Sequence, residues 1–257
     1  MNVDESLRGE MAFGYHYSSR IDPTQIFSEV ERKKRAKSWA NVEFKEYSNV
    51  QKVSLPIPTH QTWDFIATLR SRHSSRNYRD RNISLVDLST LLYYSAGILS
   101  DSSGAKLPGA GYMSRRAYPS AGARYPLEVY VIWNSHFETK SGVYHYNVKT
   151  HCLELVKDCD PSTNLQEMTG EDWAPNAQFA IALTCVFSRV FAKYGERAYR
   201  YIMLEAGHVM QNFCLVSQSM HYGICPIGGF IDDILECLLG VDGTSEAALY
   251  LATIGGM

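Results

Sequence analysis

Residues 196–220, ERAYRYIMLEAGHVMQNFCLVSQSM, predict the longest helix of the chain. Apolar side chains return along this stretch every three or four residues, at Ala198, Tyr201, Ile202, Val209, Met210, Phe213, Val216 and Met220. That 3.6-residue period is typical of a helix. Because apolar residues extend well round its circumference, we expect a core helix about 37 Å long at 1.5 Å per residue.

Strand patterns precede this helix. Residues 127–133 are dense in β-branched and aromatic side chains, and 179–187 form an apolar run suited to a central strand. Residues 143–146 and 152–156 flank the turn 147–150 and predict a hairpin.

After the helix, residues 232–239 predict a short helix and residues 247–254 a final strand. Helices and strands therefore mix without a regular βαβ repeat. This order favours an α+β fold, with long core helices around a mixed sheet, over a doubly wound one.

The first third of the chain divides at two prolines. Pro56 and Pro58 break the sequence, so we expect an extension over residues 1–58 and a compact domain over 59–257. Within the extension, Asp22-Pro23 resembles a helix start. The basic run 32–37 is expected to be a solvated helix face rather than a docking site for an acidic partner.

Two helices are predicted at the start of the compact domain. Residues 62–69 form the first, which leads into the polar string RSRHSSR at 70–76. Ser84 and Asp87 form a capping box for the second, whose leucines at 85, 88, 91 and 92 share one face. Residues 101–124 form a long loop rich in Gly, Ser and Pro, and such loops are uncommon without a function.

Composition excludes several classes of protein. The chain has 257 residues, enough for one large domain or two small ones. With 25 Lys plus Arg against 27 Asp plus Glu, the net charge is 25 − 27 = −2, which argues against a nucleic-acid binder. No apolar run approaches the ~20 residues of a membrane span, and the polar start is unlike a signal peptide. We therefore expect a cytoplasmic protein without a membrane partner.

The chain lacks several common catalytic and metal-binding signatures. Its six cysteines include no C-x-x-C pair and predict reduced, mostly buried thiols. The glycine-rich dinucleotide and P-loop motifs, H-E-x-x-H and G-x-S-x-G are absent. Glu205 and His208 form a single Glu-x-x-His, whereas a di-iron bundle needs two, so we expect no metal site.

Three segments have residues suited to a flat, phosphorylated ligand. The string 72–76 offers two guanidinium groups, an imidazole and two hydroxyls, which suit a phosphate dianion. The turn-rich loop 116–122 and the glycine pair in 226–230 allow backbone to approach a ring closely. On composition alone, a solvated loop or a plain turn explains each segment as well.

Taken in order, these segments resemble the FMN-dependent nitroreductase superfamily, and most closely its SagB-type branch of azoline dehydrogenases. The resemblance covers roughly residues 60–255. It depends on RRAYPSAGARYPLEVY at 115–130, VYHY at 143–146, and KYGERAYRY at 193–201, which is followed by EAGH and QN. The joint order is specific, although the R-x-S-x-R string alone is weak.

The resemblance implies an α+β fold with FMN at a homodimer interface. Arg72, His73, Ser74 and Arg76 would hold the phosphate and ribityl chain. Pro119, Ser120 and Gly122 would contact the cofactor from the partner subunit, and Pro226, Ile227, Gly228 and Gly229 would lie against the isoalloxazine ring. Many family members add a basic pair after the last strand, and here that phosphate contact is expected to be either missing or supplied elsewhere.

Lys193 and Tyr194 match a pair that has the catalytic position in azoline dehydrogenases. Converting an azoline to an azole removes a ring proton and a hydride, so the protein must supply a base and orient the ring. A lysine serves as a base only if desolvation or nearby cations lower its pKa, and Arg197 and Arg200 are candidates for those cations. A surface Lys-Tyr pair remains the alternative.

The first functional hypothesis is oxidation of thiazolines or oxazolines in a ribosomally made precursor peptide, with oxygen reoxidising the flavin and a cyclodehydratase as partner in a synthetase complex. A second is an NAD(P)H-dependent nitro- or quinone reductase, which needs the same flavin site but not Lys193 and Tyr194. A third is a non-catalytic scaffold of a peptide-modifying complex, which would bind no flavin.

Overall fold

A computed structural model of the chain describes residues 10–20, 44–59, 62–79, 82–100, 115–134 and 138–257. Its main feature is a seven-stranded sheet in the order β1-β6-β5-β4-β7-β9-β8. The strands are β1 (Lys52–Ser54), β4 (Leu127–Trp133), β5 (Gly142–Asn147), β6 (Cys152–Asp158), β7 (Phe179–Val186), β8 (Tyr222–Ile227) and β9 (Glu246–Gly256). A small second sheet pairs β2 (Ile98–Ser100) with β3 (Arg115–Arg116).

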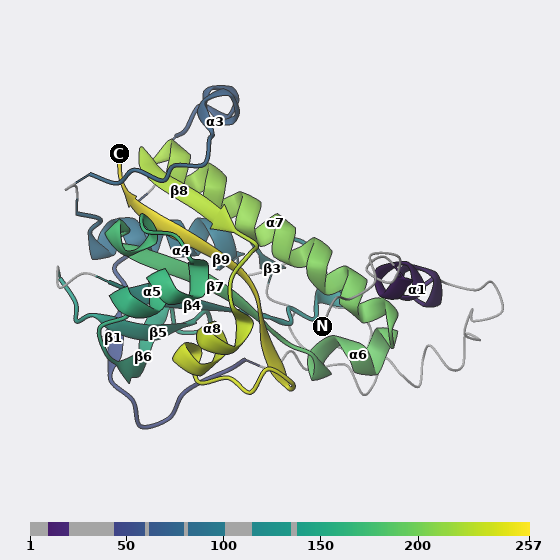
Figure 1. Ribbon diagram of the computed structural model, residues 1–257. Coiled ribbons are helices and arrows are strands. Elements are labelled where there is room, and N and C mark those ends of the chain that lie inside the picture. The colour runs from purple at the N-terminus through teal and green to yellow at the C-terminus, as the bar shows by residue number, and fades with distance from the viewer. Residues whose placement is uncertain (1–9, 21–43, 60–61, 80–81, 101–114, 135–137) are drawn as a thin grey trace.

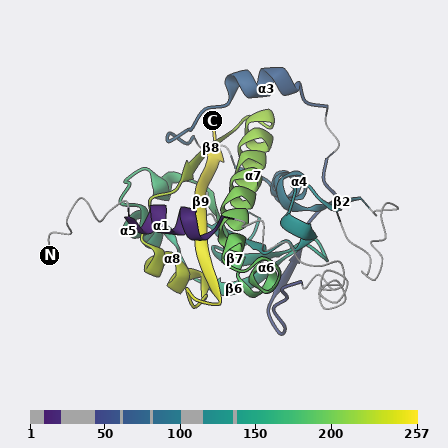
Figure 2. The same cartoon turned by 90° about the vertical axis from the view of Figure 1, so that its right-hand side faces the viewer.

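Helices cover both faces of the sheet. One face packs against α4 (Leu85–Ala96) and α7 (Arg197–Ser219), and the other against α5 (Ser162–Thr169) and α8 (Asp232–Leu239). Figure 2 shows the two layers on opposite sides of β9. The α+β class predicted from the sequence is therefore confirmed.

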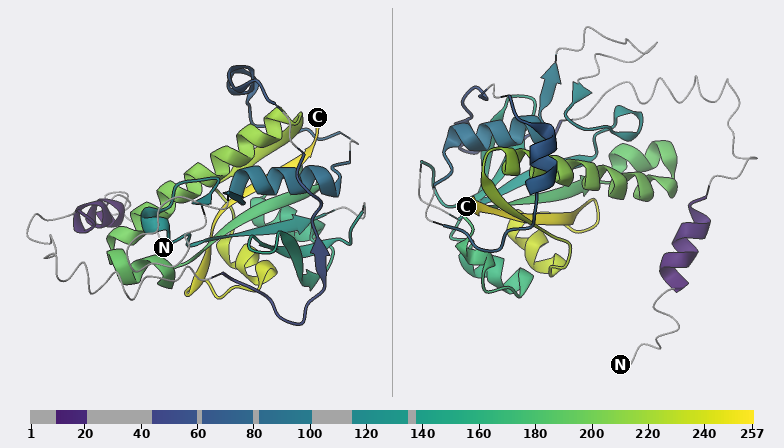
Figure 3. Two further views of the ribbon diagram at one scale, coloured as in Figure 1. Left: turned by 180° about the vertical axis from the view of Figure 1, so that it is seen from behind. Right: turned by 90° about the horizontal axis from the view of Figure 1, so that it is seen from above.

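Three further helices lie at the ends of the long helix α7. The helix α6 (Ser188–Tyr194) precedes it directly, and α1 (Glu10–Ser18) lies beside that same end (Figure 1). There, Tyr15 and Tyr199 meet edge to face at 5.5 Å between ring centroids. The helix α3 (Phe65–Ser71) lies at the opposite end of α7, as Figure 3 also shows.

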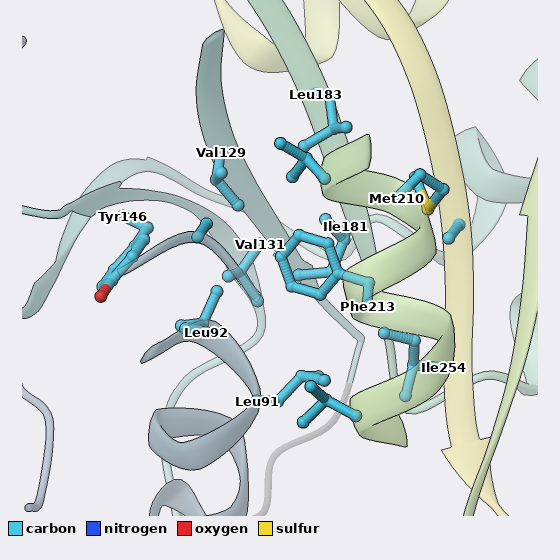
Figure 4. Packing of buried hydrophobic residues seen from close by; sticks show 14 of the residues in the cluster. Leu91, Leu92, Val129, Val131, Tyr146, Ile181, Leu183, Met210, Phe213 and Ile254 are labelled. Carbon is cyan, nitrogen blue, oxygen red and sulfur yellow. The ribbon is translucent and has the colours of Figure 1, made fainter. Parts of the chain in front are cut away.

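The larger hydrophobic core lies between α4, α7 and the sheet. Phe213 of α7 packs among Val131 and Ile181 of the sheet, with Leu91 and Leu92 approaching from α4 (Figure 4). These residues come from the apolar positions that the periodicity predicted. The long helix α7 buries one stripe, but Tyr199, Met203 and Leu204 are exposed on the other side, so it is not buried all round.

One expectation about the sheet was wrong, and one strand was missed. All the strand pairs among the described residues are antiparallel, so the sheet is not mixed, because β4, β5 and β6 follow one another as hairpins. Residues 222–227 form strand β8, where no strand was predicted from the sequence and a plain turn over 226–230 was given only as an alternative. Proline is compatible with β8 because this strand is at the edge of the sheet, where one row of N–H groups needs no partner.

The other predicted elements agree with the structure to within a few residues. Ser84 caps α4 by accepting a hydrogen bond from Asp87 N–H, as predicted, and Asp64 caps α3, which therefore begins later than expected. All six cysteines are unpaired. The helix start at Asp22-Pro23, the basic run 32–37 and most of the loop 101–124 lie outside the described residues.

Candidate active site

The string Arg72–Arg76 is attached to the edge of the sheet. Ser75 N–H donates to the Ile224 carbonyl of β8 at 2.9 Å. A Cβ on Gly223 of β8 would lie 2.8 Å from Ser75 Oγ, so glycine makes this close approach possible. Three residues after Ser75, the Tyr78 hydroxyl lies 2.7 Å from Thr253 Oγ1 of β9. The string is thus held beside the strand that ends in Pro226 and Ile227.

The two arginines of this string lie over different elements. Burial raises the pKa of the Cys214 thiol in α7 to about 11, and the positive charge of Arg72 opposes that rise. Burial likewise raises the pKa of the Cys225 thiol in β8, and there the opposing charge is Arg76. Arg76 also lies over the Trp173 ring, 5.8 Å from its centroid. The string therefore lies near both α7 and β8, which pack against each other.

An open glycine pair follows β8. Gly228 and Gly229 are exposed, and a Cβ built on either would meet no atom within 4 Å. His73, Ser74 and Arg76 are exposed as well, and Arg72 is half-buried. Exposed guanidinium and hydroxyl donors beside an unobstructed backbone fit the phosphate and ribityl chain of FMN.

The second group of predicted residues surrounds the loop 119–122. Ser120 Oγ accepts a hydrogen bond from Tyr125 N–H at 2.8 Å, which closes the loop as it enters β4. Gly122 has a φ of +60°, in the left-handed region that favours glycine. A Cβ on Gly122 would lie 2.5 Å from both Lys193 Nζ and Tyr194 OH. The fold therefore brings together residues some 70 positions apart in the sequence, with the lysine and tyrosine meeting the loop at the one residue that has no side chain.

A buried ion pair fixes the helix that carries Lys193 and Tyr194. Arg189 of α6 lies 2.5 Å from the Glu128 carboxylate of β4, and both side chains are buried. Arg189 also donates to the Tyr125 carbonyl at 3.2 Å and receives a hydrogen bond from Arg124 Nε on its own carbonyl at 3.0 Å. The start of α6 is thereby joined to the same loop that ends at Tyr125.

The pKa of Lys193 is shifted in the direction that a base requires, but the nearby cation differs from the expected ones. Burial lowers the pKa of Lys193, and the nearby charge of Arg124 lowers it further. Arg197 and Arg200 were expected to supply this charge, but they point toward α1. Arg197 donates to the Ser19 carbonyl at 2.9 Å, and Arg200 donates to the His16 carbonyl at 2.8 Å.

A cavity of about 430 Å³ opens beside this loop. It is lined by Pro119, Ser120, Ala121, Tyr194, Tyr201, Leu204, Glu205 and His208. Glu205 is 3% exposed, and burial raises the pKa of its carboxyl group to about 7. The sequence had marked Glu205 only as half of an incomplete metal motif. Among the described residues no three potential ligands gather into a metal site.

A buried polar network was not predicted. His145 of β5, which is fully buried, lies 2.8 Å from Glu128 and 3.0 Å from Glu154 of β6. Burial raises the pKa of Glu154, but hydrogen bonds from Asn147 and His145 more than compensate and lower it to about 2. The sequence signal for this network was a glutamate between apolar neighbours in each strand, at positions 128 and 154. A buried charge requires partners, but the sequence does not show which ones.

The predicted site residues thus form two groups at different positions along α7. The charge of Arg72 affects the pKa of Cys214, so the first group lies near that residue of α7. The second group surrounds the cavity that Glu205 lines. Cys214 follows Glu205 by nine positions, which corresponds to about 13 Å along the helix axis. Each group is assembled within one chain, and α7 runs from one to the other.

None of the described helices is both long and apolar enough to cross a lipid bilayer.

The sequence pattern of the nitroreductase family matches residues 69–256. Among curated proteins, one from Methanocaldococcus jannaschii, named as a nitroreductase, is 29% identical over 188 residues, 73% of this chain and 88% of that protein. The trifolitoxin-processing protein of Rhizobium leguminosarum bv. trifolii is 31% identical over 172 residues, and the microcin B17-processing protein of Escherichia coli is 29% identical over 147. These matches cover 64% and 55% of this chain but only 45% and 54% of the two toxin-processing proteins.

Solved structures give the same fold. A nitroreductase-like protein from Anabaena variabilis has a TM-score of 0.72 at 29% identity, covering 95% of this chain and 46% of that one. The E. coli microcin synthetase complex with a bound truncated precursor contains a chain with a TM-score of 0.60 at 21% identity, covering 99% of this chain and 94% of that one. An FMN-bound structure from Exiguobacterium sibiricum matches with a TM-score of 0.54 at 15% identity, covering 77% and 90%.

Proposed function

The chain belongs to the nitroreductase family, and from this premise we propose that it is an FMN-dependent dehydrogenase acting on a peptide. Its substrates would be thiazoline or oxazoline rings in a ribosomally made precursor, and its products the corresponding thiazoles or oxazoles. Relatives that process trifolitoxin and microcin B17 support this choice within the family.

One observation carries the proposal. Lys193 Nζ and Tyr194 OH converge on Gly122, the residue of the flavin-site loop that has no side chain. A nitro- or quinone reductase needs only the flavin and a place for its substrate, because the electrons come from a nicotinamide. An azoline dehydrogenase also needs a base beside the ring, and a half-buried lysine with a lowered pKa meets that need.

The proposed reaction removes two electrons and two protons from each azoline ring. Neutral Lys193 accepts the ring C–H proton, and the second ring hydrogen leaves as a hydride. FMN held in this site would supply the hydride acceptor, with oxygen as the final acceptor of the two electrons. Tyr194 OH, at the same point of the loop, orients the ring or passes the proton on. Burial and Tyr201 raise the pKa of Tyr194, so its hydroxyl keeps its proton and can donate a hydrogen bond.

The flavin site would use both groups of residues. Arg72, His73, Ser74 and Arg76 would hold the phosphate and ribityl chain, and Pro226–Gly229 would lie against the ring. Pro119, Ser120 and Gly122 would come from the second subunit of a homodimer. Apolar side chains exposed on α3 and α7 support such a dimer: Phe65, Ile66 and Leu69 on α3, and Met203 and Leu204 on α7.

We propose a cyclodehydratase as the partner that supplies azolines, because an azoline forms when a cysteine, serine or threonine side chain condenses with the preceding backbone carbonyl and loses water. We keep residues 1–58 as an extension to the catalytic domain 59–257. Within that extension, β1 pairs with β6 at the edge of the sheet, so the two parts are in contact.

The test uses purified full-length protein and a synthetic peptide carrying one thiazoline. We expect a yellow protein that releases FMN on denaturation and, in air, removes two hydrogen atoms from the peptide, measured by mass spectrometry. Arg72→Ala with Arg76→Ala should lose bound FMN on dialysis. A colourless wild-type protein that takes up no FMN would favour the scaffold hypothesis.

A nitroreductase is the second candidate, because the relative from M. jannaschii is named as one and is matched over 88% of its length. Rapid bleaching of the bound flavin by NAD(P)H, with no change in the thiazoline peptide, would select it over the first proposal.

A further inference from the structure

The carboxyl group of Glu205 is buried and, within the described part of the chain, has an oxygen without a hydrogen-bond partner. Ser120 and the Ala121 backbone lie close enough to lower its pKa, so the carboxyl group lies beside the loop that Lys193 and Tyr194 face. The oxygen Oε1 is buried and has no hydrogen-bond partner among the described residues. A buried acceptor without a donor is costly, so something must compensate for it.

A proton or a ligand could satisfy this oxygen. Burial raises the pKa of Glu205 to about 7, with Ser120, Arg116 and Ala121 opposing the rise. At pH 7, about half of the molecules therefore carry the proton when the cavity holds no ligand. The other groups that act on this carboxyl electrostatically or share its cavity are Arg116, Tyr118, Cys185, Tyr194, Tyr201 and His208.

An ionised carboxylate accepts hydrogen bonds and donates none. A carbonyl or phosphate oxygen placed against Oε1 would be repelled, whereas an N–H would be attracted. A hydrogen bond from such a donor favours the charged form of the carboxyl group, so binding and proton loss are linked. Glu205 has no other role in the proposed reaction, because Lys193 is the base of that reaction.

We propose that Glu205 Oε1 is the acceptor for an N–H group of the ligand that fills this cavity, and that the carboxyl group gives up its proton to solvent when that ligand binds. This inference rests on the proposed function, which supplies two sources of the donor. One is the ring N–H of the flavin, and the other is a backbone amide of the azoline peptide.

The test compares the wild-type protein with Glu205→Gln. The glutamine keeps one side-chain oxygen, places an NH₂ group where Oε1 was, and has no titratable proton. FMN is titrated into flavin-free protein, and the thiazoline peptide into the FMN-loaded protein. Calorimetry at pH 7 in phosphate and in Tris gives the number of protons released in each arm, because the two buffers differ in ionisation enthalpy.

In one arm, we expect the wild type to release about half a proton more than Glu205→Gln, and this difference should vanish at pH 9, where Glu205 is already ionised. The variant should bind the same ligand roughly ten- to a hundredfold more weakly. The arm that shows the difference identifies the donor. FMN phosphate can also release protons, but equally in both proteins, so the difference isolates Glu205.

Equal proton release by the two proteins in both arms, with FMN bound normally, would overturn this inference and leave the proposed function standing. A wild-type protein that binds no FMN would refute the proposed function, and this inference with it. Matching circular dichroism spectra would show that Glu205→Gln retains the fold.

Discussion

Gly122 is the residue at which the proposed catalytic groups meet. A methyl group there would lie 2.5 Å from Lys193 Nζ and Tyr194 OH, so Gly122→Ala must displace both. We expect it to lower azoline oxidation at least tenfold while the fold remains intact, measured by peptide turnover and circular dichroism. Gly170→Ala is the matched control, because Gly170 also has a positive φ of +67° but no atom within 4 Å of the added methyl. If the two variants lost azoline oxidation to the same extent, backbone strain alone would explain the loss.

Lys193 is the proposed base, so its removal should separate chemistry from flavin binding. Lys193→Ala should keep FMN and lose 10²–10⁴-fold in azoline oxidation, the usual range for a general base. Because burial and Arg124 lower the pKa of Lys193, the wild-type rate should rise with pH through that lowered pKa and then level off. Tyr194→Phe should be similarly impaired if its hydroxyl orients or moves the proton. A Lys193→Ala protein with the wild-type rate and pH profile would refute the mechanism but not the flavin site.

Glu205 should make stability depend on pH. Its pKa is about 7 in the folded protein, against 4.5 for an ordinary glutamate carboxyl group. The folded state therefore holds the proton more tightly, so the stabilisation is complete below pH 4.5 and is lost as the pH rises through 7. Glu205→Gln has no titratable proton and so does not lose this stabilisation. The difference in free energy of unfolding between the variant and wild type should therefore be about 3 kcal/mol more favourable to the variant at pH 8.5 than at pH 4.5.

Chemical denaturation at the two pH values measures this difference. Glu167→Gln, which changes an exposed glutamate on α5, is the control and should show almost none. A Glu205→Gln protein with the same pH dependence as wild type would show that the carboxyl group titrates normally.

At the scale of elements, α3 exposes an unusual amount of apolar surface. Phe65 and Ile66 are each 61% exposed on α3, which packs against the last turns of α7, and Met203 is exposed nearer the other end of α7. We propose that both patches are covered by the second subunit. Ile66→Glu and Met203→Glu should therefore shift the protein from dimer to monomer in light scattering. Val86→Glu, at an exposed apolar residue of α4, should leave the dimer unchanged. A monomeric wild-type protein loaded with FMN would remove the two-subunit site.

The short helix α6 illustrates how an element is positioned by residues far away in the sequence. Its seven residues contain too few turns to be stable alone. The buried pair of Arg189 with Glu128 and the hydrogen bond from Arg124 fix it to β4 and the loop before it. Removing one partner of a buried ion pair typically costs about 3–5 kcal/mol, so these contacts define where Lys193 lies.

At the scale of the whole molecule, the two groups of site residues predict complementation between subunits. If the loop 119–122, and with it Lys193, faces the Arg72–Arg76 string of the partner, a dimer of two different inactive chains contains one intact site. Co-expressing Lys193→Ala with the double variant Arg72→Ala and Arg76→Ala should restore about a quarter of the wild-type activity per site, since half of random dimers are mixed. No recovery in purified mixed dimers would show that each site belongs to one chain.

Much of this architecture could be predicted from local patterns. The strand at 127–133, the capping box at Ser84 and the helix near 232–239 all depend on the order of side chains within a few residues, and the structure has them at those positions. The family resemblance read from the motifs is confirmed by the match over residues 69–256. Strand β8 was missed because Pro226 argues against a strand unless the strand is known to lie at an edge.

The sequence by itself determined the α+β class, the long helix and the identity of the candidate site residues, because periodicity, caps and motifs are local and need no knowledge of neighbours. Only the tertiary structure decided which residues meet: Lys193 and Tyr194 at Gly122, Arg124 rather than Arg197 or Arg200 beside the lysine, and Glu205 beside the cavity. These are contacts between segments tens of residues apart. They depend on how α6 and α7 pack against the sheet, and the free energies of burial and of charge that give the groups their chemistry exist only once that packing has formed.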